Sequence, residues 1–203
     1  AFGTKGLKLL LKGDANDYVG KSLSGASISI KLPEESNLIE SENTIIGNTV
    51  LYGATSGKLF AAGQAGERFA VRNSGAISVI EGCGSNGCEY MTGGTVVILG
   101  DVGDNFAAGM TGGMAFIYDK DQKFHLRVNP ETLLFDQIRS DYWTNELHQI
   151  ILSHYQNTAS QHAKRILDDW ENEKNKFIHV CPKEVVAMLP QPLGFQMELE
   201  KAN

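Results

Sequence analysis

The sequence predicts a mainly β fold, a parallel β-helix (solenoid) followed by a C-terminal α-helical segment. Three observations predict this fold: the glycines are concentrated in the first part of the chain, a short phrase recurs there, and the second part shows the period of a helix. The 203-residue chain contains 22 glycines, a higher content than the average near 7%. All of them except Gly194 lie before residue 114. We therefore expect a glycine-rich β-helix over residues 1–128 and a helical extension over residues 129–203, packed on the β-helix.

A phrase of Ser or Thr followed by Gly and then a strand recurs along the first part. Its copies begin at Ser24, Ser56, Ser74, Thr92 and Thr111, at intervals of 32, 18, 18 and 19 residues. The last three copies, SGAISVIEG, TGGTVVILG and TGGMAFIYD, are the clearest. Such a period leaves no room for the crossover helix that parallel strands usually need. Each coil must instead return and stack about 4.8 Å above its start.

Each copy carries an apolar residue five positions after its glycine, which predicts a ladder of side chains in the core. The ladder is Ile30, Ala62, Ile80, Ile98 and Ile117. We expect the glycines at coil corners, where the backbone needs a positive φ or a close approach between coils. The wide first interval is expected to hold an insertion or one irregular coil around NTIIGNTVLYG.

The second part shows the period of a helix. One face is formed by Trp143, Leu147, Ile150, Ile151 and His154. A second helix is expected to start at Thr158, with Gln161 completing a capping box. Its apolar stripe is Ala163, Ile166, Leu167 and Trp170.

We expect these helices, over residues 131–176, to cover one end or flank of the solenoid, with Trp143 and Trp170 buried against it. FIHVCP, residues 177–182, is expected to form a short strand, and residues 190–203 a loose tail. The other end, near residues 1–13, is expected to be left raw and to favour homo-oligomers, because stacked coils need caps.

Charge and composition exclude several classes of protein. The formal charge of −6 argues against nucleic acid or an anionic membrane as the main partner. The longest apolar runs are far shorter than the roughly 20 residues of a membrane span, and Ala1-Phe2 opens without signal-peptide features. Three cysteines, an odd count, indicate reduced thiols and a cytoplasmic location.

The stretch EGCGSNGCEYMTGG, residues 81–94, contains Gly82-x-Gly84-x-x-Gly87, the pattern of a dinucleotide-binding loop. That loop works by opening a helix whose N–H groups hold the pyrophosphate. Only seven residues separate Gly87 from the next strand, so we interpret the glycines as coil corners.

The cysteines and histidines show no metal-site spacing. Cys83 and Cys88 lack the C-x-x-C spacing of zinc or redox sites, and Cys181 has no partner nearby in sequence. We expect buried, reduced structural thiols. The histidines contain no H-E-x-x-H motif or i,i+4 pair: His125, His148, His154, His162 and His179.

The glycine-rich part offers few residues for acid–base catalysis. They are Glu67, Arg68, Arg72, Glu81, Glu89, Asp101 and Asp104. Glu67-Arg68 and Arg72-Asn73 are expected to lie around one corner and to form an ion pair or polar network between coils. A paired-carboxylate enzyme acting on carbohydrate would require Glu89, Asp101 and Asp104 to converge in one groove.

Several long stretches, in order, resemble one family. They are GDANDYVGKSLSG (13–25), GNTVLYGATSG (47–57), GERFAVRNSGA (66–76), GCEYMTGG (87–94) and NFAAGMTGG (105–113). With weaker matches at RVNPE (127–131), RILDDW (165–170) and FIHVCP, they resemble the C-terminal domain of the glutamate synthase large (alpha) subunit. One departure is Ser85-Asn86, where the family commonly has Asp-His.

The resemblance implies a right-handed parallel β-helix and a context. It implies an enzyme that makes L-glutamate from L-glutamine and 2-oxoglutarate, with FMN and an iron–sulfur cluster held outside this segment. The partners implied are the amidotransferase and FMN-binding domains of the same enzyme and a small glutamate synthase subunit. It also implies that the β-helix is a non-catalytic scaffold, so we expect no catalytic, cofactor-binding or metal-binding residue here. The alternative is a stand-alone β-helix subunit of another oxidoreductase, such as formylmethanofuran dehydrogenase.

Overall fold

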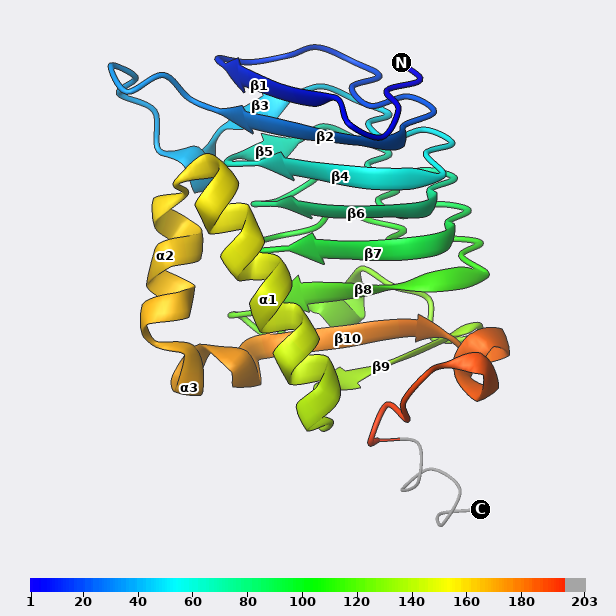
Figure 1. Ribbon diagram of the computed structural model, residues 1–203. Coiled ribbons are helices and arrows are strands. Elements are labelled where there is room, and N and C mark those ends of the chain that lie inside the picture. The colour runs from blue at the N-terminus through cyan, green and yellow to red at the C-terminus, as the bar shows by residue number, and fades with distance from the viewer. Residues whose placement is uncertain (196–203) are drawn as a thin grey trace, which may run out of the picture.

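The computed structural model describes residues 1–195 and confirms the mainly β solenoid (Figure 1). One eight-stranded sheet has the order β1-β2-β4-β6-β7-β8-β10-β9. Its parallel strands are β1 (Lys8–Lys12), β2 (Ser24–Lys31), β4 (Ser56–Ala61), β6 (Ser74–Ile80), β7 (Thr92–Ile98) and β8 (Gly112–Tyr118). Strands β3 (Thr44–Ile46) and β5 (Gln64–Ala65) form a second, two-stranded parallel sheet.

Stacked aliphatic side chains form the ladder that the repeat predicts. Ile30, Ile80, Ile98 and Ile117 are all buried, and Ile98 pairs with both Ile80 and Ile117. The second copy is shifted by one residue: Ala61, not Ala62, pairs with Ile30. The reason is an irregularity in the register between β2 and β4, which removes one residue from β4 relative to β2.

Glycine is required in the repeated phrase because successive coils approach each other closely. A Cβ atom on Gly75 would lie 2.1 Å from the carbonyl oxygen of Thr55, and one on Gly93 would lie 2.3 Å from that of Ser74. No side chain fits at such distances. The expectation that these glycines mark close approach between coils is therefore confirmed.

Turn segments opposite the main sheet combine left-handed residues with bonds to both neighbouring coils. Arg68, Ala70 and Arg72 all have φ between 53° and 58°. The N–H groups of Arg68 and Arg72 donate to the following coil, whereas that of Ala70 donates to the preceding coil. These bonds offset the cost of about 1–2 kcal/mol that a left-handed non-glycine residue carries, and they make the turn a rigid part of the stack.

The helices lie on the flank of the solenoid rather than over an end (Figure 1). Helix α1 (Asp141–Thr158) crosses the outer face of the sheet and contacts β2, β4, β6 and β7. Helices α2 (Gln161–Asp168) and α3 (Trp170–Glu173) follow it. Trp143 is buried as expected, whereas Trp170 is only half-buried.

The predicted start of the second helix is wrong. Thr158 ends α1, where its hydroxyl donates to the His154 carbonyl. Ser160 caps α2 instead, because its Oγ accepts the Ala163 N–H at 2.9 Å. Short 3-10 helices occur at several other places along the described chain: Glu40–Glu42, Phe124–Leu126, Lys174–Lys176 and Lys183–Met188.

Two antiparallel strands close the lower end of the sheet. Strand β10 (Phe177–Pro182), predicted from FIHVCP, pairs with β8, and β9 (Leu133–Gln137) pairs with β10. The predicted domain boundary at residue 128 stays a prediction.

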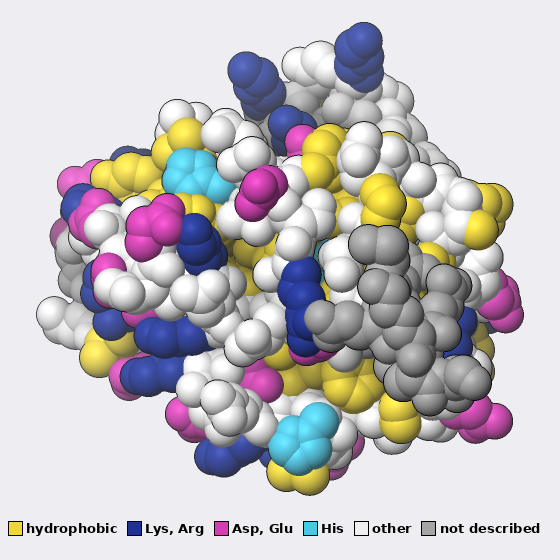
Figure 2. Space-filling model, turned by 90° about the horizontal axis from the view of Figure 1, so that it is seen from below, with side chains coloured by type: hydrophobic (Ala, Val, Ile, Leu, Met, Phe, Trp, Pro, Cys, Tyr) yellow, Lys and Arg dark blue, Asp and Glu magenta, His cyan; other side chains and the backbone are white. Residues whose placement is uncertain are grey.

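Figure 2 views the molecule from the end closed by β10 and β9. It shows positively and negatively charged side chains interspersed rather than gathered by sign.

The predicted loose tail is packed over part of its length. Leu193 and Phe195 are buried and lie against Cys181, while residues 196–203 of that prediction fall outside the described residues. Within the described chain, no helix is long and apolar enough to cross a membrane. At the opposite end β1 is exposed along its whole length, with Leu10 60% exposed. At this edge of the described sheet β1 pairs with β2 alone, and the homo-oligomer expected there stays a prediction.

Candidate functional site

A polar cluster lies buried between the solenoid and its helices. Glu81 directly follows β6, His154 lies in the last turn but one of α1, and Ser160 caps α2. The exposed fraction is 1% for Glu81 and 0% for His154 and Ser160. The Ser160 hydroxyl donates to Glu81 Oε1, and the nearest imidazole nitrogen, His154 Nε2, is 3.7 Å from the same oxygen.

Serine, histidine and glutamate are the components of a catalytic triad, but their arrangement here differs. In a triad the serine donates to the histidine, which is oriented by the acid. Here the Ser160 hydroxyl donates its hydrogen bond to Glu81, and Ser160 Oγ also accepts a hydrogen bond from the Ala163 N–H of α2. Complete burial keeps substrates from Ser160. The geometry therefore joins the start of α2 and the end of α1 to the solenoid.

Burial shifts the pKa of His154 and of the nearby Glu40. It lowers the pKa of His154, an effect that Glu81 partly opposes, so the imidazole is neutral near pH 7. Burial likewise raises the pKa of Glu40, whose Oε2 accepts the Gln161 N–H at 3.1 Å. Glu40 and Glu81 both lie at the start of α2, where the helix dipole favours negative charge.

Two further histidines have structural roles. His162 Nε2 lies 2.5 Å from the Leu99 carbonyl oxygen, and Arg165 Nη2 is 3.0 Å from His162 Nδ1. Since arginine can only donate, His162 donates to Leu99 through Nε2. His179 is buried and stacks on Phe116 with ring centroids 4.4 Å apart. Burial lowers the pKa of His179 to about 3.

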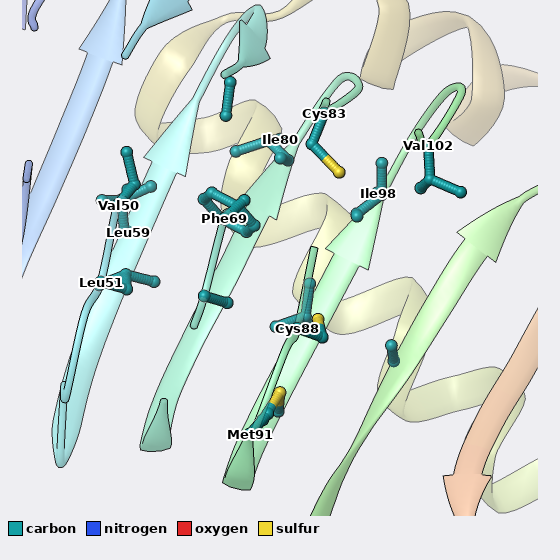
Figure 3. Close-up of a cluster of buried hydrophobic side chains, with 14 of the residues drawn as sticks. Val50, Leu51, Leu59, Phe69, Ile80, Cys83, Cys88, Met91, Ile98 and Val102 are labelled. Carbon is teal, nitrogen blue, oxygen red and sulfur yellow. The ribbon is translucent and has the colours of Figure 1, made fainter. Parts of the chain in front are cut away.

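All three cysteines are free and buried, as expected. Cys83 and Cys88 point into the solenoid interior together with Met91 (Figure 3). Burial raises the pKa of Cys83 and of Cys181 to about 12, and raises that of Cys88 well above its usual value. Thiolate is the reactive form of cysteine, so these thiols are inert in the folded chain.

The glycine pattern in residues 82–87 forms a corner between coils, and no helix follows it. A Cβ atom on Gly87 would lie 3.0 Å from Cys83 Sγ and from the Phe106 ring. The space beneath the loop is thus filled by side chains of the solenoid itself. The loop does not fit an FMN or dinucleotide phosphate, and the buried, dispersed cysteines do not fit an iron–sulfur cluster.

Charged residues at the coil corners pair between coils. Arg68 forms an ion pair with Glu89 of the next coil at 3.0 Å, so the expected contact between coils is made by Arg68. The Asn73 side chain instead bonds within its own coil, to Gly75 and Ala76. Asp104 pairs with Arg127. The N–H of Glu67 donates to Asn48 Oδ1 at 2.8 Å, and that of Arg72 donates to the Glu89 carbonyl.

The three acids of the carbohydrate-enzyme alternative lie in different surroundings. Glu89 pairs with Arg68, Asp104 lines a hollow with Asn129 and Leu133, and Asp101 lines a smaller one with Asp119. Over residues 1–195, no group of three His, Cys, Asp or Glu side chains is placed to hold a metal ion.

Sequence reasoning missed Ser160 as a partner of Glu81. Glu81 appeared only as one acid at a coil corner, and His154 only as part of a helix face. The available signal was that serine is a residue type favoured at helix N-caps. What the sequence could not supply was the contact between residues 79 positions apart.

Comparison with known proteins agrees with this architecture. A family model described as the GXGXG motif matches residues 1–183. The chain belongs to the GXGXG family. This GXGXG domain is similar to part of the glutamate synthase [NADPH] large chain of Azospirillum brasilense, with 59% identity over 193 residues, 95% of this chain and 13% of that protein.

Two further relatives carry related names. The glutamate synthase [NADPH] large chain of Bacillus subtilis (strain 168) is 50% identical over 190 residues, 93% of this chain and 12% of that protein. The glutamate synthase [NADH] of Schizosaccharomyces pombe (strain 972) is 48% identical over 201 residues, 99% of this chain and 10% of that protein. The GXGXG domain thus spans 10% to 13% of the length of these relatives.

Proposed function

We propose that this GXGXG domain is a non-catalytic structural and interaction domain of a glutamate synthase, an enzyme that makes L-glutamate from L-glutamine and 2-oxoglutarate. The observation that carries the proposal is that five side chains able to act as an acid, a base or a nucleophile are either buried or paired with an arginine. The buried ones, Glu81, His154 and Ser160, are closed to substrate. The largely covered Glu89 is paired with Arg68, and the exposed Asp104 is paired with Arg127.

The shape of the domain supports a scaffold role. Each coil hydrogen-bonds to its neighbours through both the sheet and the turn segments. A solenoid of this kind presents long, stiff surfaces to its neighbours. Of the relatives compared, one is named as an NADH enzyme and two as NADPH enzymes. Because all three contain a similar domain, we assign the choice of electron donor to another part of the enzyme, which agrees with a scaffold role.

The neighbours proposed for this domain are the amidotransferase and FMN-binding parts of the same cytoplasmic enzyme, with a small glutamate synthase subunit as a further partner. In this arrangement FMN and the iron–sulfur cluster supply the redox chemistry elsewhere. The GXGXG domain supplies a rigid spacer between catalytic parts.

The purified 203-residue chain tests the proposal. Titration with FMN should leave the flavin fluorescence unchanged, and glutamine with 2-oxoglutarate and dithionite should give no glutamate. A chain with Glu89 and Asp104 both changed to amides is the matched control. Turnover by the unmodified chain that this control lacks would contradict a non-catalytic role.

A further inference from the structure

A groove of 710 Å³ lies on the outer face of the main sheet, beside the C-terminal half of α1. In Figure 1, α1 crosses this face obliquely, and no helix of the described chain lies over the adjoining parts of β1 and β2. Strands β1, β2 and β4 form the floor of the groove, and Ser153, Gln156 and Asn157 of α1 form a wall. Part of the outer face is therefore open to another molecule.

The register of the strands places two lysines on opposite sides of the groove. Lys8 of β1 pairs with Ser27 of β2, and Ser27 pairs with Lys58 of β4. These three residues form one row across the sheet, in which the lysine Cα atoms are two strand spacings, about 10 Å, apart. Because a serine side chain is much shorter than a lysine side chain, the row has a low centre between two cations.

A second row of side chains lies two residues further along the strands. Leu10, Ser29 and Phe60 form it, and residues two apart in a strand face the same side of the sheet. Phe60 is only 2% exposed, whereas Leu10 is 60% exposed. Leu10 therefore offers apolar surface to a partner at a distance of about 7 Å along the groove from the two lysines.

The charge of the groove selects an acidic partner. Among the described residues that line it, Lys8 and Lys58 are the only charged ones. Within residues 1–195 neither lysine forms an ion pair. The whole chain carries a formal charge of −6, so the groove is a basic site on an acidic protein. A carboxylate placed between the two lysines is complementary to it.

The number and spacing of the lining residues favour a protein segment as the partner. Basic surfaces that bind anionic lipid gather about four to eight lysines or arginines, and nucleic-acid binding relies on many phosphate contacts. Two lysines are too few for either. An extended protein segment presents every second side chain on one face, about 7 Å apart, and this spacing matches the distance between the two rows of the groove.

We propose that this groove binds an extended protein segment in which an acidic residue and an apolar residue are two positions apart. The carboxylate lies above Ser27, between Lys8 and Lys58, and the apolar side chain covers Leu10. This inference goes beyond the scaffold role, because it names a surface that makes contact and the chemistry of its partner.

Titration of the ¹⁵N-labelled 203-residue chain with short peptides tests this proposal. The probe is Ac-Gly-Leu-Ser-Glu-Ser-Leu-Gly-NH₂, in which leucine stands two positions from glutamate in both directions. It should shift the amide signals of residues 8–10, 27–29, 58–60 and 153–157. A peptide with glutamine in place of glutamate should bind about fivefold more weakly, the loss expected from two exposed ion pairs. A peptide with serine in place of both leucines should bind about tenfold more weakly, because Leu10 stays uncovered.

Variants of the chain separate the groove from unspecific attraction of charge. Lys8→Gln with Lys58→Gln should weaken binding of the probe about fivefold and flatten its salt dependence. Lys120→Gln with Lys174→Gln is the matched control, since it removes the same charge outside the groove, and it should bind the probe normally. Ser27→Val keeps both lysines but fills the space between them, so it should also weaken binding of the probe.

Four results would overturn the groove as a docking site. They are no binding of the probe, equal binding by the Lys8/Lys58 variant, an equal loss in the Lys120/Lys174 control, and signal shifts confined to other residues. Sodium acetate that gives the same shifts at the same concentration would overturn it in favour of a free carboxylate ion. Dimers that dissociate in the Lys8/Lys58 variant, measured by sedimentation, would overturn it in favour of a second copy. FMN binding or turnover by the chain would contradict the scaffold role and leave these outcomes distinct.

Discussion

The two faces of the main sheet are built on different principles. The inner face repeats: Ile80, Ile98 and Ile117 stand on one another, and each coil is packed by copies of itself. The outer face occurs once. Phe60 and Val97 meet α1, and polar groups such as Glu81 are buried beside them. The comparison shows that the solenoid is stabilised by repetition, whereas the helices are placed by individual contacts.

The largest expected effect is on the stacking of the coils. Changing Gly93 to valine places side-chain atoms against the Ser74 carbonyl oxygen, 2.3 Å from the Cβ position. The coils would have to separate, so we expect loss of the cooperative fold, more than about 4 kcal/mol. Gly6→Ala is the control, since the space around Gly6 is open, and it should cost only about 1–2 kcal/mol for its positive φ. Thermal melts by circular dichroism compare the two.

A smaller effect is expected on the outer face. Leu147 of α1 is fully buried against the sheet, and Leu147→Ala should lower the free energy of unfolding by about 2–5 kcal/mol. The neighbouring half-buried Ile150 is the control, and Ile150→Ala should cost clearly less. Urea titrations measure both. Equal losses would mean that α1 does not pack as described.

The buried polar cluster sharpens the comparison further. Glu81→Ala removes the acceptor of the Ser160 hydroxyl and should cost about 2–3 kcal/mol. Glu81→Gln keeps an acceptor and should cost less. Hydrogen exchange should show the loss in the amides of α2 before those of β6 and β7. Uniform loss throughout the chain would contradict an anchoring role for Glu81.

Acidification should affect the outer face through its histidines. Burial lowers the pKa of His154 and His179 below the ordinary value of 6.5. The unfolded chain therefore binds more protons below pH 6.5, and stability falls as the pH falls from there towards 3. Each such histidine contributes a slope of up to about 1.4 kcal/mol per pH unit. His179→Leu should reduce that slope in urea titrations between pH 6.5 and 5, and an unchanged slope would contradict the neutral state of His179.

The repeat was predictable because one physical requirement recurs. Glycine is needed wherever the backbone of one coil passes the carbonyl oxygen of another, and Gly75 and Gly93 mark that point in the sequence. The one-residue shift at Ala61 was not predictable, since an irregular register leaves no compositional trace. The choice of Ser160 over Thr158 as helix cap depended on where α1 ends.

The candidate site followed less well from the sequence. Glu81 closes the stretch SGAISVIE and looks like a corner residue. Its burial depends on α1 and α2, whose residues His154 and Ser160 come more than 70 positions later. Contacts that occur once between distant segments carry no period, and no local pattern announces them.

We propose that this GXGXG domain contributes structure and contacts, not chemistry, to a glutamate synthase. The most direct measurement is the kcat of glutamate formation by the complete enzyme after four acids at the coil corners of the domain are changed together to amides. Those acids are Glu67, Glu89, Asp101 and Asp104. The account predicts a kcat within about twofold of the unmodified enzyme. A loss of about 100-fold or more in a correctly folded enzyme, the size expected for removing a catalytic acid or base, would contradict it.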